Sequence, residues 1–481
     1  MKKSLAKNSL FYFSYTFCNM LFPFIVSIYA ARILLPENIG EVAYAQNIVN
    51  YFAILAFLGL PTYGIREISI ARNNMIELSK VYSELFLINL ISTIVFSVLY
   101  YGLIIFNDAF RNNLFLYSIV GISVIFNVLN ISWLYDGLEE YGYVAIRNAI
   151  VKFVILIVAI VIIRDENDII PYAAITVLGI GGNGLINIIH AKKYVRFSLV
   201  DLNLKRHLKP VFLLVMVNLA IEIYTMIDIT MLGYMLPKEH VAFYSYASKV
   251  NKMIMQVTNT FTMILVPRIS LYYKEGNVDE FNELLTTGLK IILLLAFPII
   301  IGMQFVSVYI FILFFGAEYV HSAFVEKVLC LLILIYPIGY LLGSRVLLVS
   351  NNERKMLICV SIGAVVNVFL NLMLIPCFYE MGAAIASVIS EFIIMIIYVI
   401  LGKRLYKLKS YFATLIKILF SSVVLLIYLI ITDVINDSVY KILIQIFGAT
   451  IVYYIVLIMT RESIVWNYTI FIYNKFKGVV K

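Results

Sequence analysis

Long apolar segments follow one another along the whole chain, and short polar connections separate them. Most have about 20 residues or more, the length that an α-helix needs to cross the apolar core of a bilayer. The segments are residues 10–31, 41–60, 81–106, 113–135, 148–163, 170–189, 210–236, 246–267, 283–315, 324–349, 356–377, 382–402, 411–432 and 439–460. The pattern predicts fourteen membrane-spanning helices and no soluble domain, since the longest connection covers only residues 190–209.

The first segment begins after Lys2, Lys3 and Lys7, an arrangement that secretory signal peptides share. The apolar part of a signal peptide has roughly 7–15 residues, and this segment is longer. We therefore expect the first segment to remain in the protein as helix 1.

The composition agrees with a helical membrane protein and excludes other classes. Of the 481 residues, 63% are hydrophobic and only 14% are charged, against roughly 25% in an average soluble protein. So few charges cannot cover a soluble core, and the apolar excess excludes a disordered chain. A transmembrane β-barrel has alternating strands rather than long apolar runs. The four cysteines and four histidines show no paired spacing, so we expect no disulfide framework, metal site or other cofactor.

Basic residues are distributed unevenly between alternate connections, and the distribution predicts an orientation. Connections on the side of the N-terminus hold 27 of the 37 Lys and Arg residues, and the opposite set holds 8. Cytoplasmic connections carry the basic excess in membrane proteins, so both termini are predicted to be cytoplasmic. The net charge of +9 is explained by the basic residues in these short connections. Because they do not form the face of a soluble domain, nucleic acid is not an expected partner.

Two turns share a sequence pattern at a spacing of 201 residues. The letters LPEN at 35–38 follow the first helix, and LPKE at 236–239 follow the seventh. Six helices lie between them, an even number, so both repeats enter the membrane in the same direction. The predicted fold class is all-α, with two six-helix lobes related by a pseudo-two-fold axis along the membrane normal and a central cavity between them. The predicted parts are residues 1–209 (helices 1–6), 210–402 (helices 7–12) and 403–481 (helices 13–14 and a cytoplasmic tail).

Five short stretches carry motifs of a known family. They are ARILLPENIG at 31–40, YGIREI at 63–68, WLYDGLEEY at 133–141, DITMLG at 228–233 and GAAIAS at 382–387. In order and spacing they resemble the Wzx-type flippases of O-antigen and capsule repeat units, with Ile39 where phenylalanine is usual. This family belongs to the superfamily that also holds MATE exporters and lipid II flippases. The resemblance covers the chain from about residue 8 to residue 460.

The resemblance implies a MATE-like fold and a transport function in the bacterial plasma membrane. The expected substrate is an oligosaccharide linked to undecaprenyl pyrophosphate, carried to the outer face by alternating access without any covalent chemistry. The expected driving force is a Na⁺ or H⁺ gradient or the membrane potential. The expected partners are this substrate, membrane lipids, and the glycan polymerase and chain-length machinery.

Eight basic residues lie in the set of connections opposite to the basic-rich one, and three of these eight are close to the repeated turns. Arg32 ends helix 1, and Lys249 and Lys252 are three residues apart at the start of helix 8. Arg and Lys can pair with a pyrophosphate in a cavity of low dielectric, so these residues are candidates for a substrate site. The alternative is that they lie at the outer headgroup level and bind lipid phosphates.

Ionisable residues within the bilayer are costly and therefore mark functional candidates. Glu222 and Asp228 on helix 7 are two of them, and Glu222 is a candidate cavity acid. The resemblance to the lipid II flippase branch implies a cation site built from an acid on helix 7, two polar side chains four apart on helix 11, and helix 12. The positions here are Asp228, Asn367, Asn371, the backbone of Ala383 and the hydroxyl of Ser387. Asn371 departs from the pattern, since a carboxylate would strengthen the site. The alternative is that both asparagines only bond neighbouring helices.

Four motif residues are expected to shape turns rather than to bind substrate. Pro36 sets the backbone of the first elbow, and Gly40 permits a tight turn there. Arg66 and Glu67 are expected to form an ion pair that fixes helices 2 and 3.

Other functions make different predictions from the same features. A MATE-type cation-coupled exporter of small molecules needs an acidic cavity, whereas the paired lysines favour an anionic ligand. A membrane enzyme needs a catalytic cluster or a large outer loop, and the sequence shows neither. A scramblase or scaffold without coupling stays open.

Overall fold

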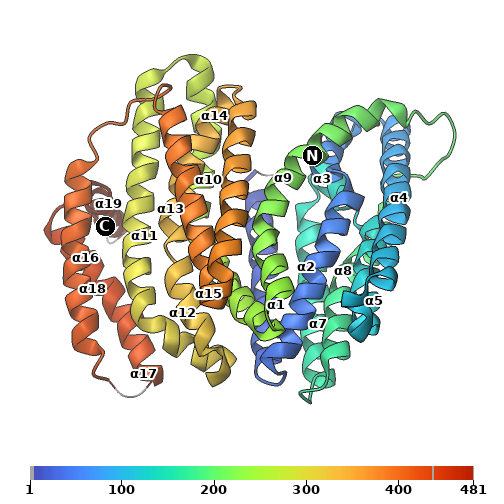
Figure 1. Ribbon diagram of the computed structural model, residues 1–481. Helices are drawn as coiled ribbons and strands as arrows, with labels where there is room; N and C mark the ends of the chain where they lie inside the picture. The colour runs from blue at the N-terminus through green and yellow to red at the C-terminus, as the bar shows by residue number, and fades with distance from the viewer. Residues whose placement is uncertain (1–4, 436–437, 480–481) are drawn as a thin grey trace. The chain divides into compact units, whose positions relative to one another are not determined.

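The computed structural model describes residues 5–435 and 438–479, and this part of the chain is helical without any β-strand. The chain divides into two compact units, one ending at Ala242 and the other beginning at Phe243. Helices follow one another in both units (Figure 1). Every predicted apolar segment lies in helices or in short turns between them, so the all-α fold with about fourteen spanning segments is confirmed. The predicted boundaries at residues 209 and 402 stay a prediction.

Unit 1 consists mainly of long helices that run antiparallel through short connections. Asn74 caps one of them, because its side chain accepts hydrogen bonds from the N–H groups of Ile76 (3.0 Å) and Glu77 (3.3 Å). The elements are α1 (Leu5–Ala31), α2 (Pro36–Phe57), α3 (Leu60–Ala71), α4 (Met75–Phe106), η1 (Asp108–Asn113), α5 (Leu114–Phe126), η2 (Asn127–Leu129), α6 (Ser132–Gly137), α7 (Tyr141–Ile162), α8 (Ile169–Ala191), α9 (Lys205–Met235) and the first residues of α10 (Lys238–Glu275).

Unit 2 continues along α10 and adds shorter and interrupted elements. These are α11 (Val278–Phe315), η3 (Ala317–Tyr319), α12 (Val320–Leu329), α13 (Leu332–Gly339), the π-helix η4 (Tyr340–Arg345), α14 (Val346–Val349), α15 (Glu353–Gly402), α16 (Phe412–Thr432), α17 (Ser438–Leu443), the π-helix η5 (Ile444–Gly448), α18 (Ala449–Met459) and α19 (Ser463–Val479). The predicted segment 324–349 is therefore two helical parts rather than one helix, because a turn at Cys330 and Leu331 separates α12 from the continuous stretch Leu332–Val349. The predicted cytoplasmic tail holds the helix α19.

The helix α15 contains two predicted segments joined by a sharp kink. Tyr379 has non-helical backbone angles there (φ 53, ψ −134). A Cβ atom on Gly382 would lie only 2.4 Å from the carbonyl oxygen of Leu374, so the chain folds back on itself directly after the kink. The sequence predicted two helices here, and the structure confirms them with almost no connection between them.

The described residues contain ten stretches that are long and apolar enough to cross a membrane. Only 28% to 50% of the residues in each such stretch are buried, and side chains such as Val98 (67% exposed) and Phe115 (68% exposed) face outward. Apolar surface on this scale needs lipid around it. α9 and α10 are not among the ten stretches, although both are long helices.

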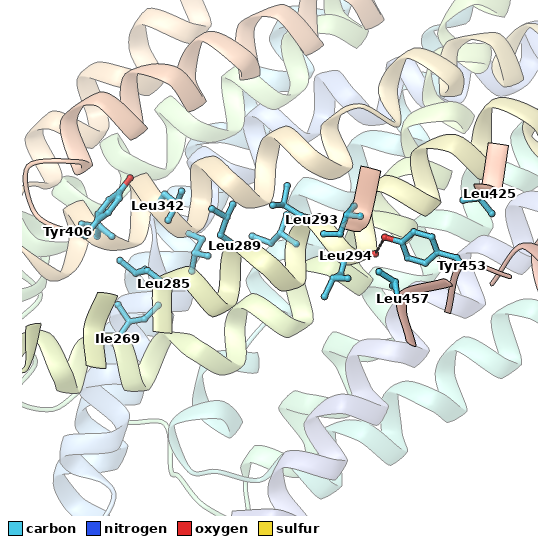
Figure 2. Packing of buried hydrophobic residues seen from close by; sticks show 14 of the residues in the cluster. Ile269, Leu285, Leu289, Leu293, Leu294, Leu342, Tyr406, Leu425, Tyr453 and Leu457 are labelled. Carbon is cyan, nitrogen blue, oxygen red and sulfur yellow. Dashed lines mark hydrogen bonds between the residues drawn. The ribbon is translucent and has the colours of Figure 1, made fainter. Parts of the chain in front are cut away.

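An apolar cluster in unit 2 connects α11 with the last predicted spans. Leu285, Leu289 and Leu293 follow one face of α11, and buried leucines of α16 and α18 belong to the same cluster (Figure 2). The hydroxyl of Tyr453 on α18 donates to the carbonyl of Leu294 (3.2 Å). Helices 13 and 14 therefore pack on the body of unit 2.

Candidate functional site

The two repeated turns pack directly against each other within unit 1. A Cβ atom on Gly40 would lie 1.7 Å from the carbonyl oxygen of Lys238, so only glycine permits this approach. Gly40 lies inside α2, which corrects its expected role: it allows close packing of the backbone and does not make a tight turn. Pro36 is in the first turn of α2, as expected, because an N–H group there has no helical partner.

Lys238 is held in this packed turn by an aromatic ring and a carbonyl group. Its Nζ atom lies 3.6 Å from the centroid of the Tyr44 ring and donates to the carbonyl of Gly233. Burial lowers the pKa of Lys238, while nearby Glu41 opposes this shift. A Cβ atom on Gly233 would lie 2.1 Å from the Tyr44 ring, so the motif glycine of DITMLG also serves close packing.

The three predicted pyrophosphate ligands fall in different units. Arg32 is exposed directly after the end of α1, in unit 1. Lys249 and Lys252 lie one turn apart on α10, in unit 2. Lys252 is exposed, and the Nζ atom of Lys249 lies 5.2 Å from the centroid of the Tyr246 ring. The joint site of all three residues stays a prediction.

The helix α10 is unusually polar for a segment at membrane depth. Besides the two lysines it carries Asn251, Thr258 and Thr262, and these three side chains are at least 97% buried. Polar side chains in a spanning helix face protein or water-filled space rather than lipid. The polarity of α10 therefore makes it a candidate for a functional helix of unit 2.

Asp228 is 5% exposed on α9, beside a polar cluster that connects α9 to α2. The amide of Asn47 on α2 donates to the hydroxyl of Thr230 (2.7 Å) and to the carbonyl of Met226 (3.3 Å). The hydroxyl of Tyr51 lies 2.8 Å from that of Thr230 and is within electrostatic range of Asp228. The side chains of Asn47, Tyr51 and Thr230 thus form one polar cluster, and its Tyr51 hydroxyl is near the buried acid.

The other predicted coupling residues belong to unit 2. Asn371 donates to the side-chain oxygen of Asn367 (3.1 Å) on the same face of α15. Ser387 and Ala383 are buried on the second half of α15, and the hydroxyl of Ser387 lies 3.2 Å from that of Tyr244. Asp228 is part of unit 1 and these residues are part of unit 2, so the five-residue cation site stays a prediction.

Three further predicted residues have a clear place in unit 1. Glu222 is exposed on α9, and its carbonyl accepts a hydrogen bond from Thr225 (3.0 Å). Arg66 and Glu67 form the expected ion pair (3.1 Å). Both lie on α3, so the pair connects neighbours on one helix instead of fixing two helices.

Sequence reasoning missed a buried ionic cluster at the start of α9. The carboxylate of Glu84 on α4 accepts hydrogen bonds from Arg206 (2.6 Å) and from the N–H of Asn203 (2.7 Å), and it lies 2.8 Å from His207 Nε2. The hydroxyl of Tyr63 on α3 lies 2.7 Å from His207 Nδ1. Glu84 and His207 are fully buried, so the cluster ties α3, α4 and α9 together. The sequence contains a sign of this cluster, because Glu84 is the only acidic residue of the apolar segment 81–106.

Known proteins with similar sequences are transporters. The chain is 24% identical over 396 residues to a Shigella dysenteriae protein described as "Putative O-antigen transporter", covering 82% of this chain and 98% of that protein. It is 25% identical over 187 residues to the lipid II flippase MurJ of Bacillus subtilis, covering 36% of this chain and 34% of that protein.

Solved structures show the same fold. The inward closed conformation of the lipid II flippase MurJ has a TM-score of 0.77 at 19% identity, covering 95% of this chain and 99% of that chain. An inward-facing multidrug resistance MATE family transporter of the MOP superfamily has a TM-score of 0.67 at 14% identity, covering 80% and 94%. The MatE family matches residues 214–373, and the family described as Polysaccharide biosynthesis protein matches residues 5–272. The chain therefore belongs to the polysaccharide biosynthesis protein family.

Proposed function

We propose that this protein is a flippase that carries lipid-linked oligosaccharide repeat units across the plasma membrane, for O-antigen, capsule or exopolysaccharide synthesis. The observation that carries the proposal is the match to an O-antigen transporter over 98% of that protein's length, in a chain with the flippase fold. The family and the MurJ-like fold support it. The reaction makes and breaks no covalent bond, so the protein acts as a transporter and not as an enzyme.

The substrate's pyrophosphate gives the lysines of α10 a specific role. Lys249 and Lys252 present two ammonium groups one turn apart on a polar helix. A pyrophosphate that leaves water must exchange its hydration for such donors. Lys249, Lys252 and Arg32 bind the pyrophosphate in this proposal, and the polyprenyl chain stays in the lipid.

Coupling to an ion gradient gives a role to the buried acid of α9. Asp228 and the nearby hydroxyl of Tyr51, which belongs to the polar cluster with Asn47 and Thr230, suit a proton or a monovalent cation. Asn367, Asn371, Ala383 and Ser387 contribute from unit 2, and Glu222 is an acid of the transport pathway. Binding that differs between two conformations would shift the population between them.

In this proposal both termini lie in the cytoplasm, and the excess of basic residues in one set of connections supports this orientation. The membrane is the plasma membrane, where repeat units are assembled on the cytoplasmic face. A glycan polymerase and chain-length machinery on the outer face would then consume the product.

Two measurements test the proposed function. Deletion of the gene should make lipid-linked repeat units accumulate on the cytoplasmic face, detected by mass spectrometry of the stalled lipid. Purified protein in proteoliposomes should move a fluorescent undecaprenyl-pyrophosphate oligosaccharide between leaflets. Normal surface glycan after deletion, or efflux of cationic drugs without lipid movement, would favour the MATE-type exporter that the MatE match also fits.

A further inference from the structure

A further buried acid lies in unit 2, on α12. Glu326 on α12 is 0% exposed. Its Oε1 atom accepts a hydrogen bond from the side-chain amide of Asn251 on α10 (3.3 Å), and its Oε2 atom has no hydrogen-bond partner. Ser322 lies one turn earlier on the same face of α12, and its hydroxyl is also buried without a partner. The structure thus leaves two polar atoms unsatisfied on this face of α12.

No described Lys, Arg or His side chain neutralises Glu326. On α12 itself, His321 lies 3.4 Å from Glu380 of α15, and Lys327 lies over the ring of Phe324 (5.6 Å). On α10, Lys249 lies over Tyr246, and Lys252 is exposed.

The remaining titratable groups near α12 do not supply a positive charge either. The thiol of Cys330 donates to the carbonyl of Lys327 (3.1 Å), and on α11 Tyr309 accepts a hydrogen bond from Lys441 (2.7 Å). Glu318 on η3 is exposed, and Glu391 on α15 is half-buried. An ionised carboxylate with one neutral donor in this position would be strongly disfavoured.

A proton fits this site better than a metal ion does. Sodium or another hard cation needs several oxygen ligands, whereas the partner of Glu326 is an amide N–H donor. The described residues also contain no group of three His, Cys, Asp or Glu side chains that could hold a metal. A protonated carboxyl group has one donor and one acceptor atom. The amide of Asn251 satisfies the acceptor, which leaves Oε2 as the atom that would carry the proton.

We propose that Glu326 is a proton-carrying site of the transport cycle, with Asn251 as the residue that positions its carboxyl group. In the conformation described here, Glu326 is protonated. In the conformation that opens this face of α12 to water, the carboxyl group releases the proton, which crosses the membrane as transport proceeds. The coupling to transport rests on the proposed flippase function, but the protonation of Glu326 does not.

The protonation state can be measured without a substrate. Infrared difference spectra of the full-length protein in liposomes, wild type against Glu326→Gln, should show the C=O stretch of a protonated carboxyl group at neutral pH. Raising the pH should remove this band from the wild type. Identical spectra of the two proteins at every pH would overturn the proposal.

The coupling is tested in proteoliposomes with an imposed pH gradient and a fluorescent lipid-linked oligosaccharide. The gradient should accelerate transport by the wild type, and Glu326→Gln should lose this dependence. Glu326→Asp should retain part of it because it keeps a titratable group. Glu318→Gln, the exposed acid of η3, is the matched control and should behave as the wild type. If Glu326→Gln keeps the pH dependence, the coupling role is overturned. If the wild type moves no lipid at all, the proposed flippase function is contradicted, and the infrared result stays valid.

Discussion

The ammonium group of Lys238 lies 3.6 Å from the centre of the Tyr44 ring. Lys238 belongs to the second repeated turn, and Tyr44 belongs to α2, the helix that follows the first repeated turn. Two glycines make this contact possible, because side chains at Gly40 and Gly233 would collide with Lys238 and Tyr44. The motif residues at these turns therefore hold the fold together at the point where the repeats meet in unit 1.

Replacing Gly40 with alanine should destabilise the protein. The added Cβ atom would lie 1.7 Å from the carbonyl oxygen of Lys238, and overpacking of this kind costs about 1–3 kcal/mol. A thermal unfolding curve followed by size-exclusion chromatography in detergent should show a lower midpoint.

Gly102→Ala is the matched control, because nothing lies within 4 Å of the Cβ position at Gly102 in α4. Alanine at that position removes a helix penalty of roughly 0.5–1 kcal/mol, so its midpoint should be unchanged or higher. Equal midpoints for the two variants would contradict the packing role of Gly40.

The double variant Lys249→Gln with Lys252→Gln should lose transport and keep its fold. Glutamine retains hydrogen-bonding capacity and removes both charges that the pyrophosphate needs, and charge-assisted bonds are about twice as strong as neutral ones. Initial rates in proteoliposomes measure the loss. Lys403→Gln, an exposed position after α15, should transport at the normal rate. Full activity of the double variant would remove the pyrophosphate role of α10.

Asp228→Asn should separate transport from its driving force. The amide preserves the shape of the buried side chain next to the cluster of Asn47, Tyr51 and Thr230, but it cannot bind a cation or proton in the same way. Transport should no longer respond to an imposed sodium or proton gradient. Asp165→Asn, at an exposed connection, provides the comparison, and a gradient response preserved in Asp228→Asn would refute the coupling role.

Glu84→Gln should weaken the anchoring of α9 on α3 and α4. The variant removes a fully buried carboxylate that accepts bonds from Arg206 and from the N–H of Asn203. Arg206 stays 38% exposed and can reach water. We therefore expect the free energy of unfolding to fall by about 1–3 kcal/mol, which is less than the cost of a fully buried unpaired charge. Glu77→Gln, which removes a longer and more exposed contact to Arg206 (3.4 Å), should change the unfolding midpoint much less.

Single cysteines in a cysteine-free background should report the orientation. Glu166→Cys lies in a connection predicted to be outside, and Lys193→Cys lies in one predicted to be cytoplasmic; both positions are exposed. A membrane-impermeant maleimide applied to right-side-out vesicles should label the first and spare the second. The reverse pattern would place the termini outside.

Hydropathy was sufficient to predict the spanning helices, because apolar length is what the bilayer selects. It could not predict that a turn at Cys330 and Leu331 breaks the segment 324–349, or that the helix after the turn contains the π-helix η4, since a change of hydrogen-bond register leaves the average hydropathy unchanged. Hydropathy also gave no indication of Glu84 and Glu326, because one acid in a long apolar segment hardly alters the mean hydropathy of that segment. The pairing of Asn367 with Asn371 was predictable from helical spacing. The contact between Gly40 and Lys238 was not, because it joins residues about two hundred positions apart.

The kink at Tyr379 has a mechanical consequence for unit 2. Almost no connection separates the two halves of α15, so the half that carries Asn367 and Asn371 and the half that carries Ser387 cannot move far apart at the kink. In the proposed cation site, this short link would limit the conformational freedom that binding has to remove.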